Sequence, residues 1–91
     1  MVDKLDNADV LMISNKGSYG YIKIQGSCET GIEVCYLAIC KYPNSDIIYL
    51  FLCNENMDVE TDWDCNSIDE AIKNAQKRSK NSIVWNTPMR K

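Results

Sequence analysis

Between residues 9 and 53, apolar and polar side chains alternate with a period of two, which is typical of β-strands. The alternation predicts strands over residues 9–14, 20–25, 32–42 and 47–53. Residues 15–18 read Asn-Lys-Gly-Ser, a composition that favours a tight reversal, so we expect the first two strands to form a hairpin. A loop at residues 26–31 and a turn at residues 43–46, which begins with proline, separate the later strands.

Two of these strands carry apolar residues on both faces. In residues 32–42 both faces become apolar midway, and residues 47–53 are apolar almost throughout. A strand can hide two apolar faces only if both are covered. We therefore expect these two strands at the centre of the sheet.

A strongly acidic segment follows. From residue 58 to residue 64, acidic residues alternate with Val59, Thr61 and Trp63. A regular strand would place the acids on one face and these three residues on the other. The four acids, which we take as the candidate binding residues, are Asp58, Glu60, Asp62 and Asp64. The alternative is that they form a solvated outer face that keeps the sheet soluble.

One helix is predicted near the carboxyl end. Ser67 fits the N-cap, and Glu70 stands at the third helical position, so the two residues predict a capping box. Apolar residues then recur at helical spacing at Ile68, Ala71, Ile72 and Ala75, which indicates one docked face. We expect the helix to end near Asn81 and Trp85 to pack over the sheet or the helix end.

Length and composition indicate one small domain, residues 1–91, because two separate cores would each be too small. No apolar run reaches the roughly 18 residues of a membrane span, and the amino end lacks the basic and apolar pattern of a secretory signal.

The chain has five cysteines, an odd number, and three of them lie in the most apolar stretches. We therefore expect reduced, structural thiols and a cytoplasmic protein.

The chain contains no histidine, which argues against the usual activation of a serine or cysteine nucleophile. No C-x2-C pair is present to start a zinc site. Asp62, Asp64 and Asn66 have the opening spacing of a calcium loop, but Ser67 stands where glycine is needed and Lys73 where glutamate is needed. We expect no catalytic residues, no metal and no cofactor, and a weak, irregular divalent-ion site at these acids stays open as an alternative.

Charge is divided along the chain. Residues 55–70 hold seven acids and no base, whereas residues 71–91 hold six bases and no acid. The helix dipole accounts for the charges near the helix ends but not for the acids of residues 58–64. An acidic strip repels nucleic acid and attracts basic protein surfaces. We therefore expect a protein partner and neither nucleic acid nor membrane.

Residues 47–85 resemble part of a loose group of small bacterial proteins, some of which are immunity proteins of toxin systems. The resemblance lies in an apolar strand, an acidic strand with tryptophan, a helix that opens Ser-x-x-Glu-Ala, and a late tryptophan. The matching residues are 48–53, 62–64, Ser67, Glu70, Ala71, Ala75 and Trp85. Proteins of the group carry acids late in the helix, where this chain has Lys77, Arg78 and Lys80. The resemblance implies an antitoxin-like binding role.

Together these observations predict an α+β fold: a four- or five-stranded, mainly antiparallel meander with one C-terminal helix packed on one face. The function we expect is that of a cytoplasmic immunity protein that binds and blocks a toxin domain through its acidic surface. Two alternatives stay open. One is a homo-oligomeric structural or accessory subunit that associates through an edge strand or through Tyr19, Tyr21, Tyr42 and Tyr49. The other is a thiol-based redox protein with Cys28 or Cys65 as the reactive group.

Overall fold

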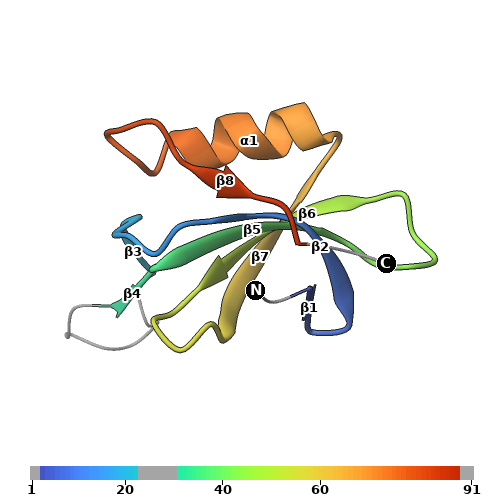
Figure 1. Cartoon of the computed structure of the whole chain (residues 1–91), viewed down its shortest axis with the longest axis horizontal. Helices are drawn as coiled ribbons and strands as arrows, with labels where there is room; N and C mark the ends of the chain where they lie inside the picture. The colour runs from blue at the N-terminus through green and yellow to red at the C-terminus, as the bar shows by residue number, and fades with distance from the viewer. Residues whose placement is uncertain (1–2, 23–30, 89–91) are drawn as a thin grey trace.

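The structure is a computed structural model, which describes residues 3–22 and 31–88. It is a mainly antiparallel sheet, curled into a half-barrel, with one C-terminal helix packed against it, as the pattern predicted (Figure 1). The elements in chain order are β1 (Lys4–Leu5), β2 (Ala8–Ser14), β3 (Tyr21–Ile22), β4 (Ile32–Glu33), β5 (Tyr36–Lys41), β6 (Ile48–Cys53), β7 (Val59–Cys65), α1 (Ile68–Gln76) and β8 (Trp85–Asn86).

The main sheet has the order β1-β2-β5-β6-β7, and every pairing in it is antiparallel. Strand β8 also pairs with β2, where Trp85 lies opposite Ser14. The two strands with apolar residues on both faces, β5 and β6, occupy the centre of the sheet, so their predicted position is confirmed. Strand β7 ends the order and leaves one side of its backbone without a strand partner among the described residues.

The predicted hairpin between residues 9–14 and 20–25 is wrong. Strand β2 pairs with β5 instead, while β3 pairs with β4 in a separate two-stranded sheet. Backbone bonds from Tyr19 N–H to Val34 C=O and from Val34 N–H to Gly20 C=O hold this second pair together. The rest of the expected strand and most of the loop at residues 26–31 lie in residues 23–30, outside the described residues.

The predicted strand 32–42 is divided into β4 and β5. Val34 and Cys35 are both buried, so the alternation of inward and outward side chains breaks at this point. Val34 bonds to the β3 side, whereas the N–H of Cys35 donates to the C=O of Cys53 at the end of β6. The chain therefore passes from one sheet to the other within two residues.

Helix α1 begins where the sequence predicts. Ser67 is the N-cap, and its Oγ accepts a hydrogen bond of 3.1 Å from the N–H of Glu70. The Glu70 carboxylate accepts from the amide of Asn66 at 3.0 Å, so the return bond of the capping box goes to a side chain.

The predicted end of the helix near Asn81 is wrong, because α1 ends at Gln76. Tight backbone bonds from Arg78 to Ala75 and from Ser79 to Gln76 close the helix. Beyond Ala75, the docked face would continue with polar residues, which have no apolar surface to bury.

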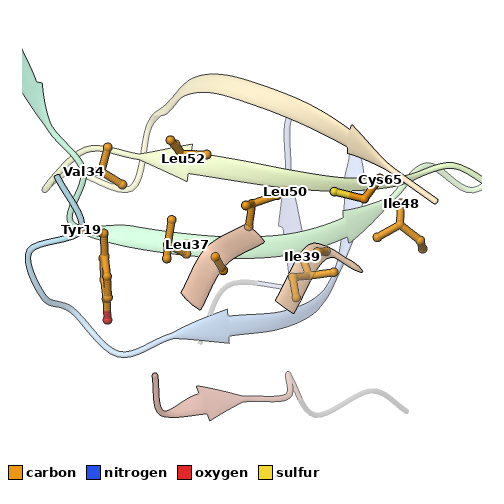
Figure 2. Packing of buried hydrophobic residues seen from close by; sticks show 10 residues of the cluster. Tyr19, Val34, Leu37, Ile39, Ile48, Leu50, Leu52 and Cys65 are labelled. Atoms are coloured by element: carbon orange, nitrogen blue, oxygen red, sulfur yellow. The ribbon is translucent and has the colours of Figure 1, made fainter. Parts of the chain in front are cut away.

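The helix contacts β5, β6 and β7 on one side of the sheet. Figure 2 shows the core between them, in which side chains from the sheet point towards the helix. Its buried residues are Tyr19, Val34, Leu37, Ile39, Ile48, Leu50, Leu52, Cys65, Ala71 and Ala75. Trp85 packs against this cluster from β8, which confirms its predicted place.

A second core lies on the opposite face of the sheet. Phe51 and Cys53 of β6 are almost inaccessible there, together with Ala38 and Cys40 of β5 and Val10 of β2. No helix among the described residues covers this face, so the curl of the sheet and partly buried side chains from its margins exclude water. Burying a large apolar side chain contributes about 1.5–3 kcal/mol, so both faces of β6 stabilise the fold.

Candidate functional site

Strand β7 is the long free edge of the sheet. Its neighbour in the sheet is β6, and the other side of β7 forms no backbone hydrogen bond with another strand within residues 3–22 and 31–88. Its seven residues contrast with two residues each in β1 and β8, which line the opposite edge. An exposed edge of this length offers backbone donors and acceptors to another chain.

All four predicted binding residues, Asp58, Glu60, Asp62 and Asp64, are exposed. We call them the acidic strip. Asp62 lies opposite Phe51 and Asp64 opposite Tyr49, which places both acids on the sheet face turned away from the helix.

The predicted strict alternation along the strip is wrong at Glu60. The pairing shifts between Leu52 and Cys53, so that Thr61 lies opposite Leu52 and Val59 opposite Cys53. Glu60 is the extra residue of this β-bulge, and Val59 therefore lies on the same face as Asp62. Asp58 precedes the strand.

The turn before β7 is organised by Asn54. Its Oδ1 accepts hydrogen bonds from the backbone N–H groups of Asn56 and Asp58, at 2.8 and 3.1 Å. Its Nδ2 donates to Oε2 of Glu60 at 2.9 Å. The amide thus fixes both the backbone and the first carboxylate of β7, which explains how a bulged residue keeps a defined position.

No base of the described part of the chain neutralises the acidic strip by a direct ion pair. Among the described residues an ion pair joins Lys4 to Asp9, which is not a residue of the strip, with 3.8 Å between Nζ and Oδ1. The negative field also acts on neighbouring groups. The pKa of the Cys53 thiol is raised to about 12, first by burial and then by Asp6, Asp58 and Glu60. Burial and then the charges of Asp6 and Asp62 raise the pKa of the Tyr42 phenol.

Asp6 is a member of this acidic surface that sequence reasoning missed. It lies in the turn between β1 and β2, and a small cleft separates that turn from β7. The residues that line the cleft are Asp6, Tyr42, Phe51, Val59, Glu60, Thr61 and Asp62. The curl of the sheet brings its first turn to its last strand, and no local sequence signal reports such a contact.

Trp63 is the aromatic residue of the same edge. It is 42% exposed and lies opposite Leu50, on the helix side of the sheet. The guanidinium carbon of Arg78 stands 5.4 Å from the centre of its ring, within the range of a cation–π interaction. The Nε of Arg78 also donates a hydrogen bond of 2.9 Å to the backbone C=O of Tyr19. Partial burial lowers the pKa of Arg78, although it stays a cation at neutral pH.

The tyrosines proposed for self-association do not form one surface. Tyr19 is 7% exposed and belongs to the helix-side core, where its hydroxyl donates to the backbone C=O of Asn15. Tyr21 is 55% exposed in β3. Tyr42 and Tyr49 contact each other edge to face, with 5.5 Å between their ring centroids, at the margin of the core on the sheet face away from the helix. Because these four tyrosines lie in separate parts of the fold, they offer a less continuous docking surface than β7 does.

The thiol alternative concerned Cys28 and Cys65. Cys28 lies outside the described residues. Cys65 is buried, its sulfur accepts a weak hydrogen bond from the amide of Asn74 at 3.7 Å, and burial raises its pKa. A buried thiol with a raised pKa is a poor nucleophile at neutral pH.

Residues 3–22 and 31–88 contain no group of three or more cysteines and acids placed to hold a metal ion. Among the helices described, none is long and apolar enough to cross a membrane. Comparison of the chain with models of protein families, with curated proteins and with solved structures gives no match.

Proposed function

We propose that this chain is a protein-binding module that docks a basic protein through β7 and its acidic strip. The observation that carries the proposal is a row of exposed carboxylates, with no direct ion pair to a described base, along a free edge strand. An exposed tryptophan stands in the same strand. Aromatic residues are enriched at protein interfaces, and complementary charge speeds the encounter of two proteins.

The partner we propose is a basic toxin domain, which the chain binds and blocks in the cytoplasm as an immunity protein. This part of the proposal is supported by the resemblance of residues 47–85 to small bacterial immunity proteins. Blocking a toxin requires tight binding and no chemistry, which suits a chain without histidine. Lys77 and Arg78, at positions where the group carries acids, lie beside Trp63 and would give this chain its own choice of partner.

The test is to neutralise the acidic strip in one variant, with Asn for each Asp and Gln for Glu60. A control variant removes the same charge elsewhere, at exposed Asp3, Glu33, Asp46 and Asp69. Each protein is used as bait in an extract of the cell that makes the chain, and the captured partner is then purified. We expect a basic protein that wild type and control capture and that the strip variant loses.

Binding kinetics then locate the contact. Steering by charge raises association rates by about 10- to 1000-fold at low ionic strength, so the strip variant should associate at least about tenfold more slowly. Its association rate should also depend less on salt, because fewer charges attract the partner. If strip and control variants associate alike at low salt, the acidic strip is not the docking surface and the proposed function is wrong.

A further inference from the structure

Strand β7 is seven residues long, and on the side away from β6 no strand of the described residues lies beside it. In a β-strand, half of the backbone N–H and C=O groups point to each side, and on β7 one side is bonded to β6. The outer groups of residues 59–65 form no backbone hydrogen bond among the described residues. An extended segment of another protein can bond to such an edge and continue the sheet.

We propose that β7 binds its partner by strand addition, so that an extended basic segment becomes the next strand of the sheet. This inference rests on the proposed function of β7 and specifies how β7 recognises its partner. Backbone hydrogen bonds supply the attachment, while the side chains of β7 select the sequence of the added strand.

The register of β7 defines that sequence. Residues directly opposite one another on adjacent strands stand about 4.5–5.5 Å apart, close enough for charge pairing. Asp62 and Asp64 share one face and would each lie opposite a lysine or arginine of the added strand. Trp63, on the other face, would lie opposite an apolar or aromatic residue. The recognised segment therefore reads basic, apolar, basic.

A second copy of this chain does not fit the same edge. Antiparallel pairing of two β7 strands about Trp63 sets Asp62 of one copy opposite Asp64 of the other. Pairing about Asp62 or Asp64 sets each of these acids opposite itself. Like charges directly opposite one another destabilise a sheet. The charge of β7 thus favours a basic occupant and disfavours self-association of two β7 strands in these registers.

The test uses two synthetic probes of about seven residues, the length of β7. The first is a blocked peptide that alternates lysine with valine. The second is a depsipeptide with the same side chains and the same charge, in which ester linkages replace the amides. The ester analogue keeps the electrostatic attraction but has no backbone N–H to donate. Titration at low salt measures affinity, and amide hydrogen exchange of the intact protein reports protection of β7.

We expect the peptide to bind and to slow exchange at outward amides of residues 59–65. The depsipeptide should bind at least about tenfold more weakly, because it loses more than one backbone hydrogen bond. Equal binding of the two probes, or peptide binding without protection of β7, overturns strand addition. If the strip variant also loses both probes in that case, charge docking stands and only the mode of attachment is wrong. Failure of the peptide to bind at all also overturns the inference, while the proposed function is still judged by the whole partner.

Discussion

Replacing Arg78 by alanine should destabilise the protein more than any change to an exposed charge. Its side chain joins three parts of the chain that are distant in sequence. It extends from the turn after α1, donates from Nε to the C=O of Tyr19 before β3, and stands over the ring of Trp63 in β7. The guanidinium also packs closely against Gly20, where an added Cβ would come within 3.2 Å of it. Gly20 also has a φ of 89°, which an alanine rarely adopts.

The expected cost follows from the two contacts. A hydrogen bond from a charged donor contributes about 1.5–3 kcal/mol, and partial exposure favours the lower end. A cation–π contact at an exposed site adds about 0.5–1 kcal/mol. We therefore expect Arg78→Ala to lower the free energy of unfolding by about 2 kcal/mol, which corresponds to a fall in Tm of roughly 8–16 °C. Arg78→Lys should lose about half as much, because it keeps the charge but not the planar group.

The assay is urea denaturation followed by circular dichroism, since urea adds no salt. Lys80→Ala is the control, because it removes the same charge from an exposed side chain. A double-mutant cycle with Trp63→Leu should give a coupling of about 0.5–1 kcal/mol. A loss in Arg78→Ala no larger than about 0.5 kcal/mol, the range of ordinary surface changes, would refute the anchoring role. A coupling of zero would show that the ring contact adds no stability.

Two further predictions concern the helix cap and a buried thiol. Ser67→Ala should cost about 1 kcal/mol in denaturant unfolding, because it removes the acceptor of the Glu70 N–H. Ser67→Asp should restore most of the loss, and equal stability of all three proteins would show that the cap does not matter. For Cys53, burial raises the pKa from 9.0 to about 12, so above pH 9 the unfolded chain loses this proton before the folded chain does. Stability should therefore fall as pH rises from 9 towards 12, by up to about 1.4 kcal/mol per pH unit, and less steeply in Cys53→Ala, as urea titrations at each pH will show.

The parts of the fold that sequence predicts are those set by neighbouring residues. The period of two located β2, β6 and β7 to within one residue, and Ser67 marked the start of α1. The apolar residues on both faces of β5 and β6 indicated that these strands are central, because a strand covered on both faces needs apolar residues on both.

The parts that sequence missed are set by residues far apart in the chain. The polar turn after Ser14 favours a hairpin locally, yet β2 gains more by pairing with β5. There the buried Oγ of Ser14 accepts a hydrogen bond of 2.9 Å from the N–H of Leu37. The bulge at Glu60 is likewise invisible to a count of alternating residues. In the sequence Arg78 is one of several bases near a helix end, and its contacts with Tyr19 and Trp63 depend on the tertiary fold, which brings these distant residues together.

The candidate site shows the same division. The acids of β7 and their exposure follow from the sequence, whereas the free edge, the bulge and the approach of Asp6 follow from the order and curl of the strands.

The uniform sign of the charges on β7 argues for a role beyond solubility. An edge strand is protected from unwanted pairing by any charge, and lysine serves this purpose as well as an acid. The chain holds ten lysine and arginine residues, yet none stands in residues 55–70. A mixed edge would reduce repulsion between neighbouring carboxylates and would protect the strand equally well. A strand that carries acids alone retains that repulsion, but it attracts an oppositely charged surface more strongly than a mixed strand would. For this reason we favour recognition of a basic partner over a merely solvated edge.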